Sequence, residues 1–144
     1  TRTRETDTSG RTIRELLTLK GHEIAASEIV PDDPTRIRAI LATWTADPTI
    51  QAILSNGGTG IAARDTTYDA IAELLDKRID GFGELFRMLS YEEIGPAAML
   101  SRAVAGVCAG KIVIAMPGSS NAVNLAMTRL VLPELGHLVY EVNK

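Results

Sequence analysis

The segment Asn56-Gly57-Gly58-Thr59-Gly60 has the composition of a loop that binds an anion. It follows an apolar stretch and precedes a helical pattern, and parallel α/β sheets bind ligands at such positions, beyond the carboxyl ends of their strands. Glycine lets backbone N–H groups approach phosphate oxygens, and the Thr59 hydroxyl adds a donor. The alternative is a turn that only reverses the chain, but three glycines in four positions exceed what a turn requires. We therefore expect this segment to bind a phosphate-bearing small molecule.

Two aspartates are candidate catalytic residues and metal ligands. Asp65 comes directly after the loop, and Asp32 stands at the expected end of another strand. Magnesium takes one or two carboxylates together with substrate phosphates and water, so this pair suits Mg²⁺. Structural alternatives stay open, because Asp65 can cap a helix and Asp32 can be a solvated turn residue. Asp33, before Pro34, is explained as a helix cap.

A second candidate loop, Pro117-Gly118-Ser119-Ser120, also lies between an apolar strand and a helix. Its amides and serine hydroxyls are suited to a second phosphate or a carboxylate. A plain N-cap role for Ser119 is an equally good interpretation. Four arginines near the N-terminus are either solvated or help to hold an acidic ligand: Arg2, Arg4, Arg11 and Arg14.

Composition excludes several classes of function. The net charge is −3, so there is no general positive field to attract nucleic acid or anionic lipid. No apolar run approaches the roughly 20 residues that span a bilayer. Cys108 is the only cysteine, which excludes an intrachain disulfide and a multi-cysteine metal site, and His22 and His137 have no ligand spacing. We expect a cytoplasmic protein with no nucleic-acid or membrane partner.

The elements that position these loops follow from apolar spacing and from turn residues. Helices are expected at residues 11–20, from Pro34, after a Thr66/Asp69 capping box, within 81–102 with a break at Gly95-Pro96, and around 123–132. Strands are expected at residues 23–30, 50–55, 103–109, 111–116 and 138–142. Gly110 marks a tight turn between two strands, which predicts an antiparallel edge.

Alternating helices and strands predict one three-layer α/β/α domain over residues 1–144, with a mainly parallel sheet and an antiparallel edge. Folds of this type usually begin with a central strand, whereas this sequence begins in a polar segment. We therefore expect the first strand to be missing from this chain.

A set of longer motifs spans nearly all of residues 1–142. They are Thr1-Arg2 with Thr6-Asp7-Thr8-Ser9-Gly10, Gly57-Gly58-Thr59-Gly60 with Arg64-Asp65, Gly81-Phe82-Gly83-Glu84, Phe86-Arg87-Met88-Leu89-Ser90 with Glu93-Ile94-Gly95, Ser101-Arg102-Ala103, and Met116-Pro117-Gly118-Ser119. With these motifs the chain resembles the molybdenum cofactor biosynthesis protein B family, a sister of the molybdopterin adenylyltransferases.

The resemblance implies a molybdopterin-binding domain that assembles as homotrimers or homohexamers. Molybdopterin is a pterin with a dithiolene and a terminal phosphate, and the active sister enzymes use ATP and magnesium to adenylylate that phosphate and release pyrophosphate. The family's two important carboxylates are similar to Asp32 and Asp65. We expect the same nucleotidyl transfer here, with a noncatalytic molybdopterin-binding or carrier protein as the alternative.

The sequence also departs from the family's pattern. The family's first strand and its Ser-Asp step are absent, and Asn56 stands where threonine is common. Ser119-Ser120-Asn121 resembles the protein B form of a loop that has a different sequence in the adenylyltransferases.

One helical stretch also points to self-assembly. It carries more large apolar side chains than a small sheet can easily cover, and this predicts a homo-oligomer. These side chains are Phe82, Phe86, Met88, Leu89 and Tyr91.

Overall fold

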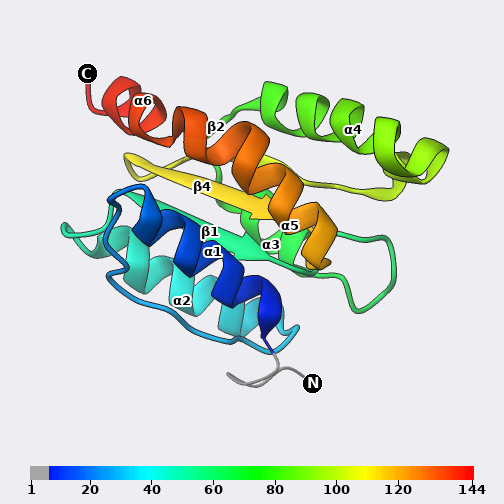
Figure 1. Cartoon of the computed structure of the whole chain (residues 1–144). Helices are drawn as coiled ribbons and strands as arrows, with labels where there is room; N and C mark the ends of the chain where they lie inside the picture. The colour runs from blue at the N-terminus through cyan, green and yellow to red at the C-terminus, as the bar shows by residue number, and fades with distance from the viewer. Residues whose placement is uncertain (1–6) are drawn as a thin grey trace.

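The elements follow the apolar patterning of the chain, and the computed structural model describes them over residues 7–144 (Figure 1). The strands are β1 (Ala52–Asn56), β2 (Lys77–Arg78), β3 (Val104–Cys108) and β4 (Lys111–Met116). The helices are α1 (Thr8–Leu19), α2 (Pro34–Ala46), α3 (Thr67–Leu74), α4 (Asp80–Ile94), α5 (Ser120–Ala126) and α6 (Leu132–Val142). A 3₁₀ helix, η1 (Gly95–Leu100), follows α4, and a π-helical segment, η2 (Met127–Val131), joins α5 to α6.

Helices cover both faces of the sheet, which explains why residues 112–116 of β4 are all apolar. Successive side chains of a strand point to opposite faces. Ile112, Ile114 and Met116 pack in a core cluster with α1, α4, α5 and α6. Val113 and Ala115 pack in a second cluster with α2 and α3. A strand buried on both faces needs a continuous apolar run, and the predicted three-layer α/β/α fold is confirmed.

The sheet is mixed, with strand order β1-β4-β3-β2. β1 pairs with β4 in parallel, whereas β4–β3 and β3–β2 are antiparallel. The predicted turn at Gly110 is confirmed as a hairpin, in which Ala109 and Gly110 have φ of 51° and 78°. Positive φ at both central residues matches the right-handed twist of the flanking strands. The sheet is thus mixed rather than mainly parallel, and the hairpin of β3 and β4 lies inside it rather than at the predicted edge.

The predicted strand at residues 23–30 is wrong, because this segment forms an irregular connection between α1 and α2. Ile24 and Ile29 are 37% and 41% exposed, so the alternation of this segment does not correspond to a buried face. Only Val30 packs against the core. The glutamates and alanines of residues 23–30 have low strand propensity, and the segment pairs with no strand of the sheet.

The predicted strand at residues 138–142 is also wrong, because it lies in α6. Leu135, Leu138, Val139 and Val142 are spaced by three and four residues and pack on the α1/α4/α5 side of the core. That spacing is helical, so packing overrides the strand propensity of valine and tyrosine.

The apolar residues of α4 divide between two faces, which corrects one premise of the oligomer prediction. Phe82, Phe86 and Leu89 are buried in the core, so they supply no surface. Met88 and Tyr91 are 52% and 58% exposed. The expected break after α4 is confirmed, since α4 ends at Ile94 and Gly95 has φ of 73°. Among residues 7–144, no helix has the length and hydropathy to span a membrane.

Candidate anion-binding site

The two candidate loops meet at one edge of the sheet. β1 and β4 pair in parallel with Asn56 opposite Met116, and the Gly57 N–H donates to the Met116 carbonyl at 2.9 Å. The glycine loop, residues 56–61, therefore lies beside the loop that follows β4. The first turns of α1, α2 and α5 gather at this same edge (Figure 1).

The backbone of the glycine loop has a conformation that other residues rarely adopt. Gly57 and Gly58 have φ of 98° and 68°. The Gly58 carbonyl accepts from the Tyr68 N–H at 3.2 Å, which ties the loop to α3. A Cβ on Gly58 would overlap the Thr67 Oγ1. Gly58 is thus required by the packing of the loop against α3, whatever the loop binds.

Arg102 turns the amides of the glycine loop outward. Its main-chain N–H donates to the Thr59 carbonyl at 3.1 Å, and its Nε and Nη2 donate to the Gly60 carbonyl at 3.0 and 2.7 Å. In a trans peptide the N–H points opposite to the carbonyl, so the amides of Gly60 and Ile61 face away from Arg102. Within residues 7–144, the amides of Gly58 through Ile61 donate no hydrogen bond to the protein. These adjacent donors are available to an anion.

Asp65 folds back into the loop and does not cap α3. Its Oδ2 accepts from the Ala62 N–H at 2.9 Å, and a Cβ on Gly60 would lie 2.8 Å from the same oxygen. The N-cap of α3 is Thr66, which makes no side-chain capping bond. The capping interpretations of Asp65 and of the Thr66/Asp69 pair are therefore wrong. The Asp65 Oδ1 accepts no hydrogen bond from the described part of the chain, so it can serve as a metal ligand.

Asp33 caps α2 as predicted, whereas Asp32 makes no polar contact within residues 7–144. The Asp33 side chain accepts from the Thr35 N–H at 3.0 Å and caps α2, with Pro34 as the first helical residue. Asp32 is exposed and, among residues 7–144, forms no hydrogen bond or ion pair.

The topology brings Asp32 and Asp65 to one edge without a contact between them. Both precede helices, α2 and α3, that cover the same face and start where β1 ends. In the described range 7–144, no group of three or more His, Cys, Asp or Glu side chains could hold a metal ion. A magnesium ion that takes one or two carboxylates and completes its shell with phosphates and water still fits this edge.

The second loop is held by its own polar groups. The Ser119 Oγ accepts from the Ala122 N–H at 3.2 Å, so the N-cap interpretation of Ser119 is confirmed. The Ser9 hydroxyl donates to the Gly118 carbonyl at 2.8 Å and joins this loop to α1. α1 begins at Thr8, before the predicted start at residue 11, because Asp7 caps it through the Gly10 N–H at 3.0 Å. Binding at Pro117-Gly118-Ser119-Ser120 stays a prediction.

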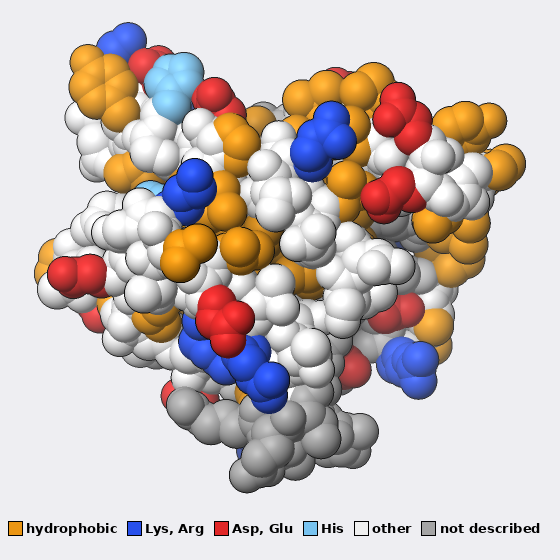
Figure 2. Space-filling view, in the orientation of Figure 1, with side chains coloured by type: hydrophobic (Ala, Val, Ile, Leu, Met, Phe, Trp, Pro, Cys, Tyr) orange, Lys and Arg blue, Asp and Glu red, His pale blue; other side chains and the backbone are white. Residues whose placement is uncertain are grey.

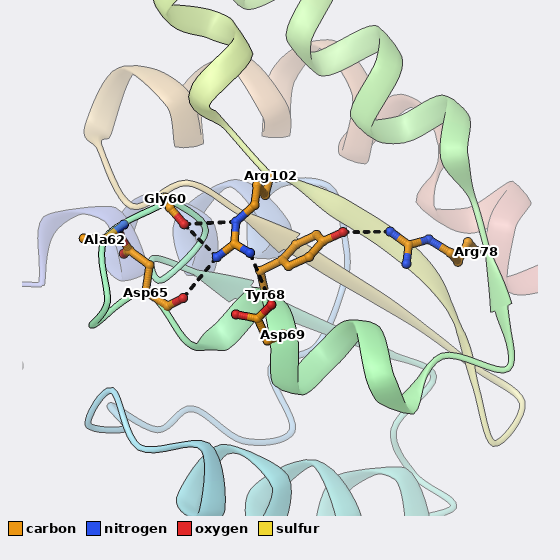
Figure 3. Close-up of polar contacts among 7 residues, drawn as sticks. All are labelled: Gly60, Ala62, Asp65, Tyr68, Asp69, Arg78 and Arg102. Atoms are coloured by element: carbon orange, nitrogen blue, oxygen red, sulfur yellow. Dashed lines mark hydrogen bonds and ion pairs between the residues drawn. The ribbon is translucent and has the colours of Figure 1, made fainter.

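A group of side chains surrounds Arg102 on the side away from the outward amides (Figure 3). Its Nη1 lies 3.2 Å from the Asp69 carboxylate, and its guanidinium carbon lies 4.5 Å from the centre of the Tyr68 ring. The Tyr68 hydroxyl accepts from Arg78 Nη2 at 2.9 Å. Arg102 belongs to the motif Ser101-Arg102-Ala103, whose local pattern does not predict these contacts.

Among residues 7–144, Arg14, Cys108 and His137 have their polar contacts outside these two loops. Arg2 and Arg4 lie outside the described residues, and Arg14 donates to the Ser27 hydroxyl at 3.2 Å. Burial, and then the nearby Asp76 carboxylate, raise the pKa of the half-buried Cys108 thiol. His137 pairs with Glu134 at 2.8 Å on exposed α6, and that hydrogen bond raises its pKa.

Comparisons with known proteins agree with this architecture. The family model described as "Probable molybdopterin binding domain" matches residues 1–137. The chain is 55% identical over 145 residues to molybdenum cofactor biosynthesis protein B of Halalkalibacterium halodurans, an alignment that covers 100% of this chain and 85% of that protein. A crystal structure of molybdenum cofactor biosynthesis protein B superposes with a TM-score of 0.95 at 52% identity, over 99% of this chain and 89% of that one. The tungsten cofactor synthesizing protein MoaB from Pyrococcus furiosus has a TM-score of 0.85 at 38% identity, over 96% and 86%.

Proposed function

Because this chain belongs to the molybdopterin-binding domain family of molybdenum cofactor biosynthesis proteins, we propose that it binds molybdopterin and adenylylates its terminal phosphate with ATP. The single observation that carries this proposal is the row of amides from Gly58 to Ile61, which donate to no described protein group. Such donors at the carboxyl edge of a parallel strand pair suit phosphate oxygens.

The proposed reaction exchanges one phosphoanhydride bond for another. An oxygen of the molybdopterin phosphate attacks the α-phosphorus of ATP and forms a new P–O bond. The bond between the α-phosphorus and the bridging oxygen breaks, and pyrophosphate leaves with the electron pair. Little acid–base chemistry is needed, so the protein contributes mainly position and charge stabilisation.

The chain's own groups divide this task. The outward amides of Gly60 and Ile61 donate to phosphate oxygens, and the free Oδ1 of Asp65 together with Asp32 would hold magnesium. When bound, magnesium neutralises negative charge on the phosphates. The loop Pro117-Gly118-Ser119-Ser120, beside the glycine loop, is the proposed site for the second phosphate-bearing partner.

We also propose that the protein works as a homo-oligomer, a trimer or a hexamer, in the cytoplasm. Hydrophobic side chains gather over α4 and the 3₁₀ helix that follows it, at the upper right of the molecule (Figure 2). This apolar surface consists of Leu85, Met88, Tyr91, Ile94, Met99 and Leu100, which are 47–74% exposed. Monomers rarely leave so many neighbouring large apolar side chains in water, so a second copy of the chain is the proposed cover.

The experiment that tests the function measures pyrophosphate release from ATP in the presence of magnesium and molybdopterin. Release that requires all three components, with adenylylated molybdopterin as the second product, is the expected result. Binding of molybdopterin without pyrophosphate release would replace the enzyme with the noncatalytic carrier. No binding of ATP or molybdopterin would overturn both.

A further inference from the structure

We propose that Arg102 is a positioning residue, whose guanidinium fixes the glycine loop and Asp65 so that their binding groups face the ligand. The inference rests on the proposed function of that loop. It assigns Arg102 no contact with substrate, because the guanidinium lies behind the carbonyls and the amides point to the other side.

The Arg102 guanidinium joins the glycine loop to Asp65, because it bonds to carbonyls of both (Figure 3). Besides the bonds to Thr59 and Gly60 described above, its Nη2 donates to the Asp65 carbonyl at 3.1 Å. The other hydrogen bonds of residues 60–65 are local and involve Ala62, Arg64 and their near neighbours. Across the described range 7–144, Arg102 thus makes every hydrogen bond that ties this segment to a distant part of the chain.

The charge of Arg102 also strengthens the donors on the far side of the loop. Hydrogen bonds from a charged donor are roughly twice as strong as neutral ones. A cation at the Gly60 carbonyl polarises the peptide between Gly60 and Ile61, and a polarised peptide has a more positive N–H. The Ile61 amide therefore becomes a better donor to an anion, although Arg102 itself stays on the opposite side.

The surroundings of Arg102 hold it in this role without making it a second anion site. Asp69 neutralises Nη1 at 3.2 Å, and the Tyr68 ring lies under the guanidinium. Nε and Nη2 are both used by loop carbonyls. The planar guanidinium satisfies these directions at once, whereas the single ammonium of lysine cannot.

Arg78 provides a matched control. It lies in the same cluster, donates to the Tyr68 hydroxyl at 2.9 Å and lies 3.6 Å from Asp80, but it donates to no loop carbonyl. Arg102→Lys and Arg78→Lys both keep the positive charge. The two variants therefore separate the geometry of the loop from the electrostatics of the region.

The test compares wild type, Arg102→Lys and Arg78→Lys in three measurements: urea unfolding, calorimetric binding of inorganic pyrophosphate with magnesium, and amide NMR shifts of Gly60 and Ile61 without ligand. Arg102→Lys should bind pyrophosphate about tenfold more weakly, as expected for the loss of charge-assisted hydrogen bonds that order a site. Arg102→Lys should also lower the unfolding free energy more than Arg78→Lys, because it loses three loop hydrogen bonds, whereas Arg78→Lys should bind pyrophosphate like wild type. Wild-type affinity in a folded Arg102→Lys protein would overturn the proposal.

A milder variant keeps the proposal testable if Arg102→Lys does not fold. Asp69→Asn leaves every loop contact of Arg102 but removes the anion that holds Nη1, so pyrophosphate affinity should fall about two- to threefold. Unchanged affinity in that variant would then overturn the proposal. If wild type binds no pyrophosphate, the proposed function fails. The amide NMR shifts of the ligand-free protein still test the role of Arg102 in that case. Only Arg102→Lys should change the amide shifts of Gly60 and Ile61, and unchanged shifts would refute its positioning role.

Discussion

The Asp65 carboxylate accepts a hydrogen bond from the Ala62 amide at 2.9 Å, and only one of its two oxygens is used in this way. Asparagine can keep that contact through its carbonyl oxygen while it removes the charge. Asp65→Asn should therefore leave the melting temperature nearly unchanged and lower pyrophosphate release about a hundredfold, as when other charge-stabilising groups are lost.

Asp47 offers the control for that substitution. Its Oδ1 also accepts from a nearby main-chain amide, the Thr49 N–H at 2.8 Å, but Asp47 lies before β1, at the opposite end of the strand. Asp47→Asn should leave turnover unchanged. Equal turnover in wild type and Asp65→Asn would remove Asp65 from the mechanism.

Asp32 and its neighbour Asp33 form a second matched pair. Asp33→Asn should change neither turnover nor stability, because asparagine caps helices as well as aspartate does. Asp32→Asn should lower pyrophosphate release and leave unfolding unchanged, since Asp32 has no bond to lose among the described residues. The double variant of Asp32 and Asp65 should lose less than the sum of the two if both hold one ion. Strict additivity would argue for separate roles.

Alanine substitutions at Gly58 and Gly21 distinguish the cost of steric crowding from the cost of backbone strain. Both have positive φ, of 68° and 87°, but a Cβ would meet Thr67 at Gly58 and nothing within 4 Å at Gly21. Gly21→Ala should lower the free energy of unfolding by about 1–2 kcal/mol, the cost of a left-handed backbone for alanine. Gly58→Ala should cost clearly more in the same urea titration. Equal losses would mean that the Thr67 side chain moves aside without cost.

The apolar surface of α4 and η1 predicts a change of assembly state on charge insertion. The double variant Met88→Glu/Tyr91→Glu should shift the mass measured by light scattering towards the 15.5 kDa protomer. Leu19→Glu is the control, because Leu19 is 83% exposed on α1, outside this surface. A wild-type mass of 15.5 kDa at all micromolar concentrations would contradict the proposed oligomer.

The sequence predicted the strands beside the two candidate loops better than the connections around them. The predicted strand at residues 111–116 is confirmed as β4, whose apolar residues 112–116 pack on both faces of the sheet. The segments 23–30 and 138–142 were wrong because local propensity cannot tell which partner a segment packs against. In the second case the helical spacing of Leu135, Leu138 and Val142 was the better signal.

The roles of single polar residues were the least accessible from sequence. Asp65 has the pattern of a helix cap, yet it bonds backward to Ala62. Arg102 follows the glycine loop by about 40 residues, and no local pattern links it to the Gly60 carbonyl, a contact between residues 42 positions apart. Such contacts depend on how β1, β3 and β4 align, which only the folded chain reveals.

The outward donors at Gly60 and Ile61 belong to the main chain, so the sequence can drift at the surface of the loop without altering them. The Ile61 side chain is 69% exposed, and its replacement leaves the amide in place. An alanine scan of this loop would thus report the side chains that shape the loop, but it would not detect the main-chain amides that bind the anion. Replacement of the Ile61 amide by an ester removes the donor itself, and backbone chemistry of that kind, rather than side-chain mutagenesis, reaches the atoms on which anion binding depends.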